Sequence, residues 1–98
     1  MIKTSPTIEF EQFLSLVEGL KEFRSITGNL YSIVSLNDHN LRFIRESTGV
    51  QWNMDLKKVY HAYFELTEFK TIYFKPYLPR RQSPALGLLI TLELLQKL

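Results

Sequence analysis

The sequence has no cysteine among its 98 residues and only two histidines. The absence of cysteine excludes disulfide bridges, iron–sulfur clusters, thiolate zinc sites and cysteine nucleophiles. The histidines, His39 and His61, lie in no metal-ligand or catalytic-triad spacing. The four glycines are isolated from one another, so the sequence has no glycine-rich loop to hold a nucleotide phosphate. We therefore expect neither a cofactor nor a metal ion.

The sequence also lacks a long hydrophobic run. Its most apolar segment, residues 85–98, is shorter than the roughly 20 residues that span a bilayer, and it contains Glu93. The residues before Glu9 include no apolar stretch of the kind found in secretory signals. These two absences predict a cytoplasmic protein with no membrane segment.

A strong overall charge is missing as well, because the formal net charge is only +2. A charge of that size does not by itself indicate a polyanionic partner. The charge is unevenly distributed, however: residues 1–68 carry seven basic and nine acidic residues, whereas residues 69–98 carry five and one. A negatively charged partner is therefore expected to favour the C-terminal part of the chain.

Hydrophobic residues make up 45% of the sequence, which is enough for the core of one domain of this length. Apolar residues recur every three to four positions over residues 5–24 and 54–66, and this spacing predicts two helices. Ser5, followed by proline, suits the start of the first helix, and Asn53 or Asp55 can cap the second.

Between these two helices the apolar and polar residues alternate, which indicates β-structure. The alternation and the turn residues around it predict three strands, over residues 30–36, 41–47 and 50–52. In the first hairpin we expect Leu36 to face Leu41 across a polar turn. The same register pairs Val34 with Phe43.

The C-terminal part of the chain predicts one more strand and one more helix. Residues 71–75 are mostly β-branched and aromatic, as is typical of a strand. Ser83 and Pro84 suit the start of a helix over residues 84–97. Leucines point in all directions around this helix, so most of its sides must be buried.

A 98-residue domain has little interior in which to enclose such a helix completely. We therefore predict that the helix pairs with a second copy of the chain, because obligate dimer interfaces resemble a core cut in half. The residues expected at this homodimer interface are Leu88, Leu89, Leu92 and Leu95. The alternative is that the helix packs across the sheet beside the first helix.

Together these elements predict a single small α+β domain over residues 1–98, in the order α-β-β-β-α-β-α. The sheet is expected to be mainly antiparallel and covered by helices on one face.

Basic and aromatic residues are interleaved over residues 69–83. The cations are Lys70, Lys75, Arg80 and Arg81, and the aromatic residues are Phe69, Tyr73, Phe74 and Tyr77. A single strand of nucleic acid could find both phosphate contacts and stacking surfaces on such a segment. The alternative interpretation is a solvated connector whose aromatic residues belong to a strand.

The same segment contains Pro76-Tyr77-Leu78-Pro79 followed by two arginines, a spacing that docks into aromatic grooves of other domains. Lys75 occupies the first hydrophobic slot of that motif, and the segment is anchored between two predicted elements. We therefore interpret it as a stiff elbow.

The order helix, three strands, helix over residues 7–66 resembles that of a double-stranded-RNA-binding domain. The resemblance implies phosphate contacts from Lys57 and Lys58, which lie near the start of the second helix. The sequence departs from the family pattern because Asp55 precedes the lysines, the glycine-rich approach is missing, and a further strand and helix follow. The resemblance covers the order of elements alone, and such an order does not carry function.

Catalytic patterns are few. Glu68-Phe69-Lys70 resembles the acid-x-lysine arm of metal-dependent nucleases, but tripeptides of this kind arise by chance in most proteins. His61 and Glu65 share a helix face, where a surface hydrogen bond explains them. We expect a non-enzymatic interaction module that binds a second copy of itself or another protein. The alternative is a nucleic-acid-binding regulator that uses residues 69–83.

Overall fold

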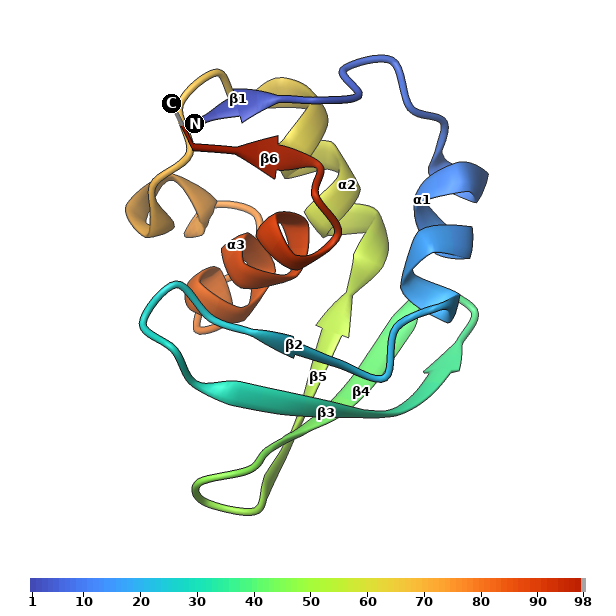
Figure 1. Cartoon of the computed structure of the whole chain (residues 1–98), viewed down its shortest axis with the longest axis vertical. Helices are drawn as coiled ribbons and strands as arrows, with labels where there is room; N and C mark the ends of the chain where they lie inside the picture. Colours follow the sequence, from blue (N-terminus) through green and yellow to red (C-terminus); the bar gives the residue numbers. More distant parts are fainter. Residues whose placement is uncertain (98) are drawn as a thin grey trace.

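Four antiparallel strands form a sheet in the order β2-β3-β4-β5, and the three α-helices lie on one face of it (Figure 1). The structure is a computed structural model that describes residues 1–97. Its elements are β1 (Ile2–Lys3), α1 (Phe10–Glu18), β2 (Glu22–Arg24), β3 (Leu30–Asn37), β4 (Asn40–Arg45), β5 (Val50–Asp55), α2 (Leu56–Glu65), the 3-10 helix η1 (Thr71–Phe74), α3 (Gln82–Thr91) and β6 (Leu95–Gln96). The predicted α+β class, with a mainly antiparallel sheet covered on one face, is confirmed.

The first hairpin has the predicted turn and a different register beyond it. Leu36 pairs with Leu41 as expected, but Phe43 pairs with Ile33 and not with Val34. The cause is a β-bulge between Ile33 and Ser35, which leaves Val34 as the extra residue. Val34 is consequently half exposed, while Phe43 points into the core.

The first helix is shorter than the predicted 5–24. It begins after Glu9, whose backbone N–H donates to the side chain of Gln12, and it ends at Glu18, with Gly19 as its C-cap. The chain then extends into β2, where Phe23 is buried between two exposed residues. Phe23 fits both a helical spacing and a two-residue alternation, so the sequence pattern could not separate the two elements.

The second helix agrees closely with its prediction. α2 begins after Asp55, whose carboxylate accepts the backbone N–H of Lys57 at 2.9 Å. Asp55 is therefore the expected helix cap. It is also the last residue of the edge strand β5, so α2 follows this strand directly.

The strand predicted over residues 71–75 is wrong, because this segment forms η1. In a strand, Ile72 and Phe74 would lie on the same face. The turn of η1 separates them, so that Phe74 is fully buried while Ile72 is 68% exposed. Backbone hydrogen bonds from Tyr73 to Lys70 and from Leu78 to Phe74, at 3.0 and 2.8 Å, hold this arrangement.

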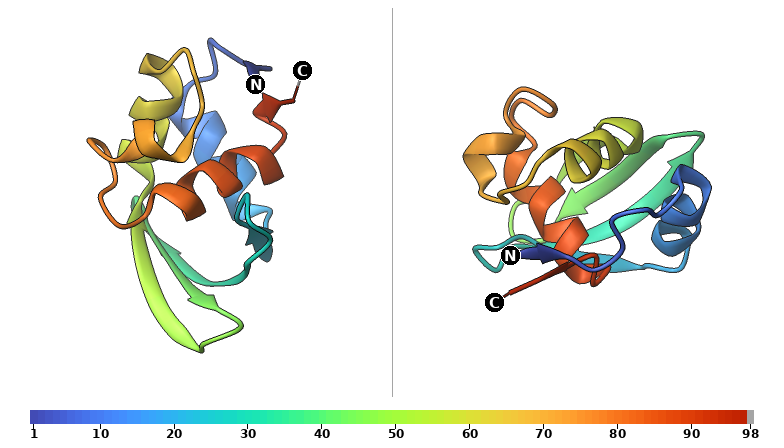
Figure 2. Two further views of the ribbon diagram at one scale, coloured as in Figure 1. Left: turned by 90° about the vertical axis from the view of Figure 1, so that its left-hand side faces the viewer. Right: turned by 90° about the horizontal axis from the view of Figure 1, so that it is seen from above.

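The helix predicted over residues 84–97 also ends early. α3 ends at Thr91, and Glu93 takes a positive φ of 62° that turns the chain into β6. β6 pairs with β1 in a second, two-stranded sheet, with Ile2 opposite Gln96. Figure 2 shows the resulting proximity of the two chain ends.

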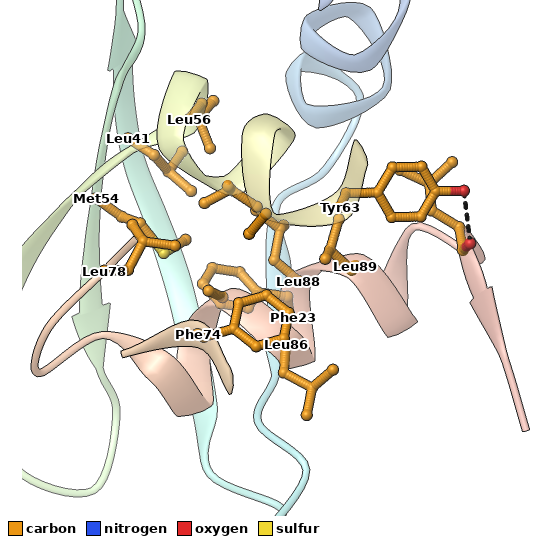
Figure 3. Close-up of a cluster of buried hydrophobic side chains, with 14 of the residues drawn as sticks. Phe23, Leu41, Met54, Leu56, Tyr63, Phe74, Leu78, Leu86, Leu88 and Leu89 are labelled. Atoms are coloured by element: carbon orange, nitrogen blue, oxygen red, sulfur yellow. Dashed lines mark hydrogen bonds between the residues drawn. The ribbon is translucent and has the colours of Figure 1, made fainter. Parts of the chain in front are cut away.

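α3 is enclosed within the single chain. Leu86, Leu88 and Leu89 are fully buried in the main hydrophobic cluster (Figure 3), and η1, β2 and β6 all contact the helix. A Cβ atom on Gly87 would lie 2.2 Å from the carbonyl oxygen of Arg24, so the helix touches the backbone of β2 directly. The prediction that one domain could not enclose this helix is therefore wrong. Among residues 1–97, no helix is long and apolar enough to cross a membrane.

A buried tyrosine connects the two ends of the chain to α2. The hydroxyl of Tyr63 donates to the carbonyl of Leu94 at 2.9 Å, as the dashed line in Figure 3 shows, and it accepts the backbone N–H of Ser5 at 3.1 Å. The ammonium group of Lys3 donates to the carbonyl of Phe64 at 2.8 Å. These bonds fix the N-terminal strand over the helical layer.

Candidate functional site

Three of the six predicted anion-binding residues lie around one groove. Lys58, Arg80 and Arg81 line it together with Tyr77 and the end of β5, and its volume is about 280 Å³. We call this hollow the basic groove; its remaining lining residues are Asn53, Met54, Asp55, Leu78 and Pro79. It brings together the start of α2 and the connector between η1 and α3, which are far apart in the sequence.

The connector reaches β5 through a series of tight turns. The backbone N–H of Tyr77 donates to Phe74 at 3.0 Å, and that of Arg81 donates to Leu78 at 3.0 Å. Arg80 takes a positive φ of 67°, which is uncommon for a residue with a side chain. The predicted elbow between two elements is thus present, and it places consecutive arginines beside the edge of the sheet.

Arg81 has a structural role in this groove. Its Nε donates to the backbone carbonyl of Asn53 at 2.9 Å, and its guanidinium carbon lies 4.8 Å from the ring centre of Trp52. The side chain thus occupies a backbone acceptor at the open edge of β5, a position that would otherwise be available to another strand. Arg81 is therefore not available as a mobile phosphate contact.

Lys58 and Arg80 are the available cations of the groove. Both are exposed, and neither side-chain cation is held by an intramolecular hydrogen bond within residues 1–97. The acid beside them, Asp55, already accepts the N–H of Lys57 as the cap of α2. The groove thus offers two free positive charges next to one occupied carboxylate.

Tyr77 forms one wall of the groove. Its hydroxyl donates to a carboxylate oxygen of Glu65 at 2.9 Å, and this hydrogen bond raises the pKa of Tyr77. The bond connects the connector to the C-terminal end of α2.

The other predicted cations lie elsewhere. Lys57, Lys70 and Lys75 are exposed and do not line the basic groove. Lys75 lines a second hollow of about 530 Å³, together with two exposed isoleucines, Ile26 and Ile72. We call it the isoleucine hollow; its other lining residues are Thr27, Thr71, Gln82 and Ser83. The sequence pattern does not indicate this hollow, because Ile72 fits the predicted strand and Ile26 lies in a turn.

The aromatic residues of the connector are largely unavailable for stacking. Phe69 and Phe74 are buried in the core, and Tyr77 is engaged with Glu65. Only Tyr73 of the four keeps a substantial exposed surface. This segment therefore does not present the row of cations and exposed aromatic rings on which a single strand of nucleic acid would bind.

The four leucines nominated for a dimer interface lie in or beside the core. Leu88, Leu89 and Leu95 are buried, and Leu92 is half-buried. A side chain that is already enclosed by its own chain cannot contact a second copy without unfolding. Three of the four residues are therefore part of the chain's own core, and the homodimer interface through this helix stays a prediction.

The residues considered for catalysis are not assembled into a site. His39 is exposed, and its ring packs edge-on against Phe10 at 5.0 Å. His61 is exposed on α2. Within residues 1–97, no group of three or more histidine, aspartate or glutamate side chains could hold a metal ion.

No protein family matches the sequence, and neither a curated protein nor a solved structure is significantly similar to it.

Proposed function

We propose that the chain is a non-enzymatic protein-interaction module whose basic groove binds a negatively charged side chain of a partner protein. The observation that carries this proposal is the convergence of Lys58 and Arg80 on one groove, with no hydrogen bond occupying either cation within residues 1–97. Unpaired cations at a surface hollow attract an anionic group and set its orientation.

The size of the groove supports a side chain as its ligand. A volume of about 280 Å³ is at or below the lower end of the roughly 300–1,000 Å³ found for pockets that enclose whole small molecules. A carboxylate or phosphorylated side chain fits such a space, and the rest of the partner can then lie on the surrounding surface.

A nucleic acid is the second candidate, because the same two cations could contact phosphates. The burial of Phe69 and Phe74 argues against it, since a bound single strand depends on exposed aromatic rings for stacking. A homodimer through α3 is not part of the proposal, because three of the four leucines named for it are buried.

A binding experiment with two probes tests the proposal. The full chain is titrated into a fluorescein-labelled hexaglutamate peptide and, separately, into a labelled mixed-sequence single-stranded DNA, with fluorescence anisotropy as the readout. We expect the peptide to bind at low ionic strength. The double variant Lys58→Glu, Arg80→Glu should weaken peptide binding at least about tenfold.

The matched control is Lys21→Glu with Lys97→Glu, which makes the same change in net charge at exposed positions outside the groove. Equal losses in the two double variants would show that only net charge matters, and the proposal would fail. DNA binding that is tighter than peptide binding, and that loses its salt dependence in the groove variant, would favour the nucleic-acid alternative.

A further inference from the structure

The isoleucine hollow has the properties of a binding surface for an aliphatic side chain. Ile72 is 68% exposed and Ile26 is 44% exposed, although both are large hydrophobic residues. They come from segments far apart in the sequence and line the same hollow. Single exposed isoleucines are common on protein surfaces, whereas two that line the same hollow concentrate apolar surface at one place.

The isoleucine hollow and the basic groove lie next to each other. Arg81 lines the basic groove, and the following residue, Gln82, lines the isoleucine hollow. Consecutive Cα atoms are only about 3.8 Å apart, so the linings of the two hollows meet at the start of α3. The left view of Figure 2 faces the side on which η1, the start of α3 and the turn between β2 and β3 lie.

The charges along this combined surface are mostly of one sign. Lys58 and Arg80 line one hollow and Lys75 lines the other, while the acid that lines either hollow is Asp55, already used as a helix cap. An occupant with complementary chemistry must carry negative charge beside an apolar group. A chain in extended conformation advances about 3.3 Å per residue, so a few residues suffice to pass from one hollow to the other where their linings meet.

We propose that an extended acidic segment of a partner protein binds across both hollows, with a carboxylate between Lys58 and Arg80 and an aliphatic side chain against Ile26 and Ile72. This inference rests on the proposed function and adds to it the identity of the bound segment. The apolar contact gives the partner's aliphatic side chain a specific place, which charge attraction alone cannot provide.

Selection from a random 12-residue peptide library displayed on phage, with the full chain as bait, tests the inference. We expect the enriched peptides to share at least one acidic and one large aliphatic residue at a fixed spacing. One enriched peptide is then synthesised with a fluorescent label, and its dissociation constant is measured with the wild-type chain and with variants.

The decisive variant is Ile26→Ser with Ile72→Ser, which removes the apolar contact without a change in charge. Its matched control is Val34→Ser with Val50→Ser, two valines that are half exposed on the sheet. We expect the isoleucine variant to weaken peptide binding at least about tenfold. The valine variant should change it by less than about twofold. Circular dichroism establishes that both variants are folded.

The outcomes separate the two proposals. If the isoleucine variant binds the selected peptide as tightly as the wild type, the further inference is overturned while the basic groove can still stand. An enriched set without acidic residues, or without aliphatic ones, also overturns it. If the hexaglutamate titration shows no effect of Lys58→Glu with Arg80→Glu, the proposed function itself fails. A light-scattering mass of two chains at tens of micromolar, lost in the isoleucine variant, would identify a second copy as the occupant and contradict the inference.

Discussion

Substitution of Gly87 by alanine tests whether α3 packs directly against β2. The helical preference of alanine predicts a gain in stability, whereas this packing predicts a loss. In an ordinary exposed helix, a change from glycine to alanine stabilises the protein by about 1 kcal/mol. In this protein the added Cβ atom would lie 2.2 Å from the carbonyl oxygen of Arg24 and 2.6 Å from the Cα atom of Ser25. Both neighbours are backbone atoms of β2 and the turn after it, so neither can rotate away. We therefore expect Gly87→Ala to destabilise the fold.

The magnitude follows from the displacement that the methyl group requires. α3 must move away from β2 by about 1 Å to restore an ordinary contact, and overpacking of this kind costs about 1–3 kcal/mol or more. The helical preference of alanine offsets about 1 kcal/mol of that cost. Because the atoms that the methyl group meets are backbone atoms, the cost lies at the upper end of this range, about 3 kcal/mol, and we expect a net loss of about 2 kcal/mol in the free energy of unfolding. For a domain of this size the loss corresponds to a decrease in Tm of about 10 °C.

Urea denaturation followed by circular dichroism measures the effect. Gly19→Ala is the matched control, because Gly19 has an ordinary helical φ of −79° and its added Cβ atom would come no closer than 3.5 Å to Leu16. The control should change the free energy of unfolding by less than about 0.5 kcal/mol. A Gly87→Ala variant as stable as the wild type, or more stable, would refute the direct contact between α3 and β2.

Three further substitutions test particular contacts. Arg81→Ala should lower the free energy of unfolding by about 1–2 kcal/mol and shift the tryptophan fluorescence, because it removes a charged hydrogen bond and the cation over the indole. Arg80→Ala should change neither property, and equal effects of the two variants would contradict the structural role of Arg81. Tyr63→Phe should cost about 1–2 kcal/mol in urea denaturation, because its hydroxyl bonds one buried and one part-buried backbone group; no loss would mean that these bonds do not hold the N-terminal strand. Burial raises the pKa of Tyr31 above its usual 10.0, so this hydroxyl ionises first in the unfolded chain and the free energy of unfolding should fall as the pH rises through that value. Tyr31→Phe should show a smaller fall in urea denaturation at alkaline pH, and an unchanged pH profile would refute the assignment.

The parts of the fold that were predictable from the sequence are those with a clear local period. The β3–β4 hairpin and α2 are defined by alternation, by turn residues and by the Asp55 cap, all of which lie close together in the sequence. The parts that were missed depend on contacts that are distant in the sequence. Phe23 is part of a strand because β3 pairs with it, and Phe74 is buried in the core, where its ring packs against Phe69.

The enclosure of α3 was also beyond local patterns. Leucines on all sides of the helix correctly indicated burial on most sides. Gly87 has no side chain, however, so the helix lies directly against the backbone of β2 and is enclosed within one chain. The sequence therefore predicted that this helix is buried, but not that β2 of the same chain covers it.

The candidate site was predictable in part for a similar reason. The excess of positive charge near Arg80 was visible in the sequence, but the approach of Lys58 and the engagement of Arg81 with Asn53 require the folded connector. The placement of Ile26 and Ile72 in the lining of one hollow had no local signal, because each isoleucine by itself is an ordinary surface residue.

Because β1 pairs with β6, we expect the fold to tolerate circular permutation of the chain. Since Ile2 and Gln96 face each other, a short linker could join the ends into a closed ring. New ends could then be opened at the exposed tip between β4 and β5, around residues 46–49, where little packing would be lost. In such a permuted chain the β4–β5 hairpin, now the most local part of the fold, would have to form between its first and last segments.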